Sequence, residues 1–198
     1  KQGLNGIIED GSQRSYFPTG LAFYVYGETL FDSSKTLEEL TEDYYRHAFG
    51  EKWQEVLDYM RKVSACFDFE YMSGHCTLDK EKSKVFNPAM AERLAQVGKL
   101  TADFIPVIEA NKNQHRRASS YAWRLLRHHA DFLNYIAQVA IQRAVGDNEG
   151  AMQTMKRYVN DFSDREPYIA TCYDFAMIWH AYRISGLFTN QPTSFFIN

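Results

Sequence analysis

The feature that most constrains the fold is a long helical repeat in the second half of the chain. Apolar side chains and one histidine recur three or four residues apart at Ala122, Leu125, His129, Phe132, Leu133, Ile136 and Ala140. Residues at this spacing share one face of an α-helix, so the pattern predicts a long amphipathic helix. Gly146 supplies its stop, because glycine readily adopts the left-handed conformation that ends helices.

The stretch after residue 31 begins with two shorter helical patterns. Thr36, with Glu39 three residues later, forms a capping box that predicts a helix start, and Gly50 marks its end. A second apolar stripe follows over residues 53–67, and the short connection favours an antiparallel pair. Residues 71–86 lack such spacing and read as a long loop.

Further helices are predicted on both sides of the long repeat. Asn87 and Pro88 resemble the cap and first turn of a helix, in which Pro106 should cause a kink or end the regular part. Asp147 is a cap candidate for the next helix, and Pro167 is predicted to open the last one. The predicted fold class is all-α, a bundle of about seven helices.

The first part of the chain, Ile7–Phe31, differs from the rest. Residues 6–8 form a short apolar run that suits a brief strand ending at the acidic pair Glu9 and Asp10. A polar loop follows, and then an aromatic helix with Pro18 expected in its first turn.

Composition limits the classes of partner. The formal net charge of -3 and the pI near 6.1 provide no electrostatic footprint for nucleic acid or an acidic membrane. No apolar run approaches the length of about 20 residues that a membrane-spanning helix needs. Three cysteines argue against a disulfide-stapled module, although spacing leaves a Cys66–Cys76 bridge open. The start at Lys1 suggests a processed product or a piece of a longer protein.

Candidate metal and cofactor sites are weak. His128 and His129 are adjacent, so on a helix they point about 100° apart, and we expect a packed His129 with one hydrogen bond. His75 and Cys76 lack the repeated ligand spacing of a zinc site. Nucleotide-binding and nucleophile motifs are absent as well. No metal or cofactor is therefore predicted.

Two polar clusters remain. Glu9, Asp10, Arg14 and Tyr16 lie in the loop after the predicted strand, and such a set could bind a polyhydroxylated ligand if the strand belongs to a barrel. The alternative is an ordinary loop that is polar because it faces water. A basic cluster, formed by Arg116, Arg117, Arg124 and Arg127, reads as a solvated face paired to nearby acids.

A resemblance to a known family is carried by residues 9–60, which read EDGSQRSYFPTGLAFYVYGETLFDSSKTLEELTEDYYRHAFGEKWQEVLDYM. The order of an acid-rich strand end, Arg14, an aromatic helix with Leu30 and Phe31, an acidic helix and the run Ala48, Phe49, Gly50 resembles the C-terminal region of a bacterial glycoside-hydrolase-like family of unknown function. That family is distantly similar to alpha-glucuronidases and hexosaminidases. The resemblance implies that residues 1–32 end a (β/α)8 barrel and that residues 33–198 form a C-terminal helical domain.

The functional hypothesis follows from this resemblance. The chain is expected to be the C-terminal helical fragment of a glycoside hydrolase, without the catalytic acids of the parent protein. Its expected partners are the missing N-terminal barrel, a carbohydrate ligand held by Glu9, Asp10, Arg14 and Tyr16, and a second copy in a homo-oligomer. The alternative hypothesis is a stand-alone helical interaction or scaffold domain with no enzymatic activity.

Overall fold

The described part of the chain is mostly helical. The computed structural model describes residue 14 and residues 17–68, 71–72 and 86–174, and these contain no β-strand. The α-helices are α1 (Leu21–Phe31), α2 (Leu37–Phe49), α3 (Trp53–Cys66), α5 (Pro88–Leu94), α6 (Gln96–Asn111), α7 (Arg117–Ala144) and α8 (Asn148–Ile169), and the 3-10 turn η1 (Gly50–Lys52) joins α2 to α3. The prediction of an all-α fold is confirmed for these residues, whereas the predicted strand over residues 6–8 lies outside them.

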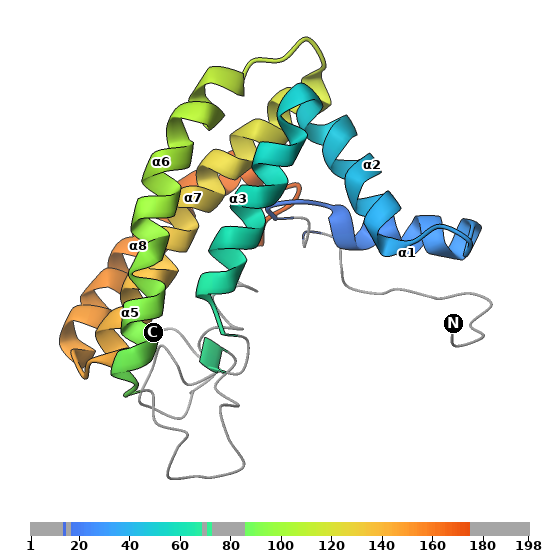
Figure 1. Cartoon of the computed structure of the whole chain (residues 1–198). Coiled ribbons are helices and arrows are strands. Elements are labelled where there is room, and N and C mark those ends of the chain that lie inside the picture. Colours follow the sequence, from blue (N-terminus) through green and yellow to red (C-terminus); the bar gives the residue numbers. More distant parts are fainter. Residues whose placement is uncertain (1–13, 15–16, 69–70, 73–85, 175–198) are drawn as a thin grey trace.

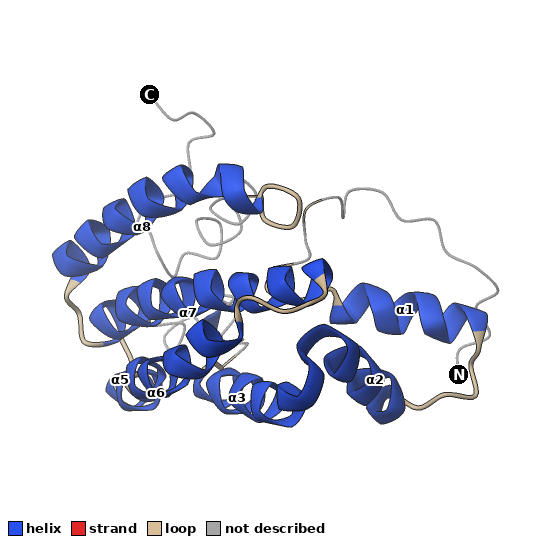
Figure 2. Cartoon of the chain, turned by 90° about the horizontal axis from the view of Figure 1, so that it is seen from above, coloured by secondary structure: helices blue, strands red, loops and turns tan. Residues whose placement is uncertain are grey.

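Helix α7 is the centre of the arrangement. Seen from above, it lies between α8 on one side and α5, α6 and α3 on the other (Figure 2). Helix α1 extends beyond this group beside α2 (Figure 1). The long apolar repeat therefore forms the helix that touches most of the others, as expected for a face that needs burial along its whole length.

The core consists of two adjoining groups of buried side chains. Around Trp123 and Leu126, the first turns of α7 pack against α2, α3 and α6, and the ring of Phe49 meets Trp123 edge-on at 5.3 Å between centroids. Further along α7, Phe132 contacts Tyr158 and other rings of α8. Burial of such large rings contributes about 2 kcal/mol or more each, so α7 stabilises both halves.

The predicted helix boundaries are confirmed at several points. Thr36 and Glu39 form both hydrogen bonds of the capping box at the start of α2. Asn87 caps α5 through Met90 N, and the side chain of Asp147 accepts from Gly150 N at the start of α8. These caps satisfy backbone N–H groups that have no partner within their helices.

Two glycines occupy backbone conformations that other residues rarely adopt. Gly50 has a φ of 63° after α2, and Gly146 has a φ of 87° after α7. The absence of a Cβ removes the steric cost there, and the chain can reverse direction between neighbouring helices.

Pro18 and Pro167 do not begin helices as predicted. Pro18 precedes α1, which begins at Leu21. Pro106 and Pro167 lie inside α6 and α8, although Pro167 was expected to open a new helix. Each proline removes only one intrahelical hydrogen bond, and the buried side chains of Ile108 and Ile169 hold the turns that follow.

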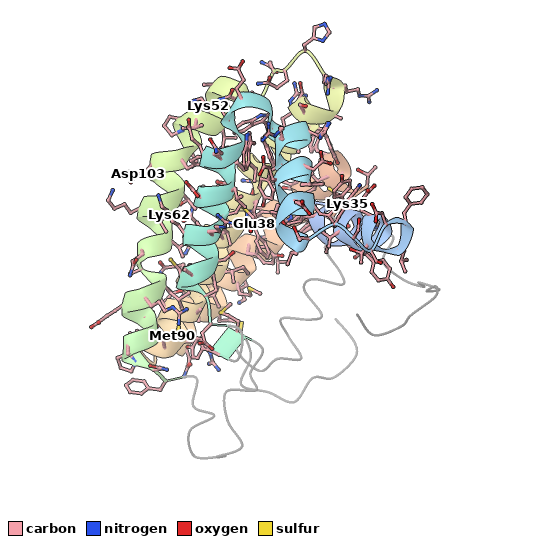
Figure 3. All side chains as sticks on the ribbon, turned by 45° about the vertical axis from the view of Figure 1, so that its right-hand side comes forward. Lys35, Glu38, Lys52, Lys62, Met90 and Asp103 are labelled. Atoms are coloured by element: carbon pink, nitrogen blue, oxygen red, sulfur yellow. The ribbon has the colours of Figure 1, made fainter. Side chains whose placement is uncertain are left out.

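Polar side chains cover the outer surface of α3 and α6. Lys62 of α3 and Asp103 of α6 are exposed and lie on this surface (Figure 3). The break between α5 and α6, near Ala95, was not predicted, because the spacing of apolar residues continues across it.

Candidate ligand pocket

A pocket of about 690 Å³ opens between α1, α2, α7 and the segment that follows α8. Its apolar wall contains Ala48 of α2, Ala118, Ala122 and Leu125 of α7, and Pro18. The three residues from α7 are four and three positions apart, so one face of that helix supplies them. Because three of these five residues are alanines, the helices leave room that larger side chains would fill.

Three polar side chains face this apolar wall. The hydroxyl of Tyr24 on α1 donates a hydrogen bond to Asp43 Oδ2 on α2. His47, one turn further along α2, has its Nδ1 3.3 Å from Asp43 Oδ1 and 2.8 Å from the Asp43 carbonyl oxygen. All three residues line the pocket. The side chains of His47 and Asp43 are 67% and 48% exposed, so a ligand can reach them.

The Tyr24 phenol stays protonated to a higher pH than an ordinary tyrosine. The hydrogen bond to Asp43, together with burial and the charge of Asp43, raises the pKa of Tyr24 to about 12. An anionic phenolate beside a carboxylate would be repelled, whereas the neutral hydroxyl stabilises it. The pair thus presents one negative charge to the pocket.

Tyr44 fixes the start of α1 against α2. Its hydroxyl accepts a hydrogen bond of 2.8 Å from Gly20 N, the residue before the helix. Its ring also lies 5.6 Å from the Tyr24 ring, and burial raises the pKa of Tyr44. These contacts determine where Tyr24 enters the pocket.

The opposite wall is formed by Tyr121, Thr171 and Cys172. The Tyr121 hydroxyl lies 2.7 Å from Thr171 Oγ1 and 3.5 Å from Cys172 Sγ, and the Cys172 thiol donates to the Ile169 carbonyl at 3.3 Å. Burial raises the pKa of the Cys172 thiol. A protonated thiol is a poor nucleophile, so this wall suits binding more than covalent chemistry.

Of the four predicted site residues, only Arg14 is described, and it does not line this pocket. Arg14 forms an ion pair with Glu166, lies 3.7 Å from Asp174 Oδ2 and donates a 3.0 Å hydrogen bond to the Tyr173 carbonyl. Glu9, Asp10 and Tyr16 lie outside the described residues. Arg14 therefore holds the chain against the end of α8, and its role in ligand binding stays a prediction.

The buried His129 is packed as expected. It is 7% exposed, stacks on Phe132 and meets the Phe17 ring edge-on. Burial lowers its pKa to about 3. The expected hydrogen bond is not made at Nδ1, which has no partner among the described residues. A histidine with such surroundings stays neutral at physiological pH.

The two described cysteines, Cys66 and Cys172, have free thiols. Cys66 is buried, whereas Cys76, to which spacing left a bridge open, lies outside the described residues. Over residues 17–68 and 86–174, no group of three or more His, Cys, Asp or Glu side chains is arranged to hold a metal ion.

Sequence reasoning missed the residues that shape the pocket. Asp43 and His47 are four residues apart in a helix that the sequence predicts, and this spacing was the available signal. Tyr24 and Tyr121 could not have been joined to them, because only the packing of α1 and α7 against α2 brings these distant positions together.

Comparison of the chain with protein-family models, curated proteins and solved structures gives no match. The resemblance carried by residues 9–60 accordingly stays a prediction. In the described part of the chain, none of the helices combines the length and apolar character needed to cross a bilayer.

Proposed function

We propose that this helical domain binds a small amphipathic molecule in the pocket between α1, α2 and α7. The supporting observation is an apolar space of about 690 Å³ with one accessible carboxylate, Asp43, on its wall. Ligand pockets typically combine mostly apolar walls with a few polar groups that orient the ligand. Asp43 accepts hydrogen bonds, so the ligand would carry an ammonium or hydroxyl group at this end.

The experiment compares 2-phenylethylamine with its neutral analogue 2-phenylethanol by NMR titration. Both should shift signals of Ala48, Ala122 and Leu125, and the amine should bind about 5-fold more tightly through Asp43. Asp43→Asn should remove the preference for the amine while leaving binding of the alcohol. Shifts that do not involve these three residues would refute the proposal.

A blocking variant provides the control. Ala122→Phe should fill the pocket and abolish binding of both compounds, with circular dichroism confirming that the helices persist. Ala48→Leu blocks the space from α2 and serves if the first variant does not fold. Ala110→Leu, on exposed surface of α6 away from the pocket, should leave binding unchanged.

We also propose the function that the family resemblance of residues 9–60 implies. The chain would be the helical C-terminal part of a glycoside-hydrolase-like protein, with about seven helices and with residues 1–32 ending a (β/α)8 barrel. A polar groove of about 390 Å³ between α7 and α8 favours a sugar ligand, because Asn134, Tyr135, Gln138, Arg157 and Asp161 line it. Amide, charged and aromatic groups together suit the hydroxyls and apolar faces of a sugar.

The test is calorimetric titration with maltohexaose and cellohexaose. Tyr135→Ala should weaken binding if the groove holds the sugar, whereas Asp10→Ala and Arg14→Ala should weaken it if the N-terminal loop does. An absence of heat with both oligosaccharides would count against a carbohydrate ligand of this α- or β-glucan class.

The alternative role as an interaction domain is favoured by one surface. Leu30, Phe31 and Leu37 at the turn between α1 and α2 are exposed, and Phe31 is 92% exposed. Exposed apolar groups of this kind often mark an interface. Light scattering should show a loss of self-association with Phe31→Ser if a second copy covers this surface, and a monomeric parent chain would exclude the homo-oligomer.

A further inference from the structure

A second pocket adjoins the first. It has a volume of about 760 Å³ and shares Ala118, Tyr121 and Thr171 with the apolar pocket. The hydrogen bond of 2.7 Å between Tyr121 and Thr171 joins α7 to the segment after α8 at this common wall. A molecule in the apolar pocket can therefore extend past Tyr121 into the second pocket without leaving the surface.

The second pocket is basic. His115, Arg117 and Arg124 line it, together with the neutral Gln114, Ser120 and Tyr168. No carboxylate is among its described lining residues. This local charge contrasts with the formal net charge of -3 of the whole chain.

The arginines of this pocket are not neutralised by acids in the described part of the chain. Arg124 Nε donates at 3.3 Å to the Lys112 carbonyl, and its Nη2 donates at 2.8 Å to Asn113 Oδ1, both uncharged acceptors. Arg127, one turn further along α7, instead pairs with Asp131 at 2.5 Å and Glu109 at 3.5 Å. The prediction that the whole basic cluster is paired to acids is thus wrong for Arg124.

We propose that the ligand of the apolar pocket carries an anionic group, a carboxylate or a phosphate, that Arg117 and Arg124 bind in the adjoining basic pocket. This inference rests on the proposed function. The guanidinium group donates two parallel hydrogen bonds to either anion, which favours arginine at such positions. Asp43 would repel an anion, so the ligand has one orientation, with its donor group at Asp43 and its anion beyond Tyr121.

The experiment measures binding of a series of ω-phenylalkanoates and the corresponding ω-phenylalkanols of increasing chain length. The acids should bind more tightly than the alcohols only above the length that reaches Arg117, and there by about 5-fold at low salt. Phenylalkyl phosphates of the same lengths separate a carboxylate preference from a phosphate preference. A constant ratio of acid to alcohol affinity at every length would overturn the two-point arrangement.

Adjacent arginines offer a matched pair of variants. Arg117→Gln should bring the affinity of the long acids down to that of the alcohols, whereas Arg116→Gln removes the same charge outside the pocket lining and should leave the difference in place. Equal losses in the two variants would indicate general charge attraction and refute the proposal.

Two controls separate this inference from the proposed function. If the alcohols bind and Ala122→Phe abolishes their binding, but the acids gain nothing, only the anion site is refuted. If the alcohols do not bind, or Ala122→Phe has no effect on them, the apolar pocket itself fails. Inorganic phosphate that competes with the alcohols as strongly as with the acids would also overturn the inference, because it would place the anion inside the apolar pocket.

Discussion

The hydroxyl of Tyr24 on α1 donates a hydrogen bond to the carboxylate of Asp43 on α2, at the edge of the apolar pocket. This bond joins α1 to the body of the molecule, because α2 is the helix against which α1 packs. The position of α1, and with it one wall of the pocket, therefore depends on a polar contact as well as on apolar burial.

We predict that Tyr24 titrates well above an ordinary tyrosine. The bond to Asp43 raises the pKa of Tyr24 to about 12, above the value of 10.0 in the unfolded chain. The bond therefore stabilises the fold fully below pH 10.0, and this stabilisation is lost as the pH rises through about 12. NMR of tyrosine labelled with ¹³C at Cζ measures this pKa, and Tyr24→Phe assigns the signal. Asp43→Asn should move the midpoint back toward 10.0. An unchanged midpoint would show that Asp43 is not the cause.

We predict that His129 makes the protein sensitive to acid. Burial lowers the pKa of His129 to about 3, below the unfolded value of 6.5. The neutral ring therefore contributes stability that is fully present above pH 6.5 and is lost as the pH falls toward 3. Urea unfolding at pH 7 and pH 5 should show a decrease on the order of 2 kcal/mol from this group.

The variant His129→Leu provides the comparison, because a leucine can occupy the apolar surroundings without titrating. Its loss of stability between pH 7 and pH 5 should be smaller than that of the parent protein. Both proteins contain the same carboxylates, so the effect of these groups on the free energy of unfolding cancels when the two proteins are compared. Parallel pH profiles would mean that His129 is not protonated during unfolding.

We predict that Thr36→Ala destabilises the protein by about 1 kcal/mol, since it removes an N-cap. The Thr36 hydroxyl accepts from Glu39 N at 3.2 Å, and Glu39 Oε2 accepts from Thr36 N at 2.7 Å. Thr29→Ala makes the same change at an exposed position in α1 and should have little effect. Chemical denaturation distinguishes the two, and equal effects would exclude a special role for the cap.

We predict that Asp131→Asn loosens the contact between α7 and α8. Asp131 accepts from Arg127 and from Arg165, each at 2.5 Å, and Arg165 also pairs with Asp161 at 2.8 Å. The network is half-buried, so the variant should lose about 1 kcal/mol of unfolding free energy. Lys99→Gln breaks the exposed pair with Asp103 and serves as control. A larger effect of the control would refute this ranking.

The sequence predicted the starts of several helices well, because the contacts that stabilise these starts lie within a few residues. The capping box at Thr36 and the caps at Asn87 and Asp147 act through hydrogen bonds within a few residues, so a short window of sequence contains them. Pro167 was expected to begin a helix but lies inside α8, because tertiary burial of Ile169 outweighs the loss of one backbone bond.

The candidate site could not be predicted in the same way. Asp43 and His47 share a helix face that the sequence implies, but Tyr24, Tyr121 and Cys172 join them only through packing. The pocket is a space between helices, and its size depends on how closely α1, α2 and α7 approach one another. Nothing in the spacing of alanines reveals whether the room they leave is filled by a neighbour.

The sequence by itself determined that the described chain is mainly helical, where several helices start, and which face of the long repeat is buried, because spacing and caps are local. Only the tertiary structure decided that α7 lies at the centre, that Asp43 meets Tyr24, and that the apolar pocket adjoins Arg117 and Arg124. These relationships depend on crossing angles and close packing between residues far apart in the chain, and those are fixed by the fit of whole surfaces.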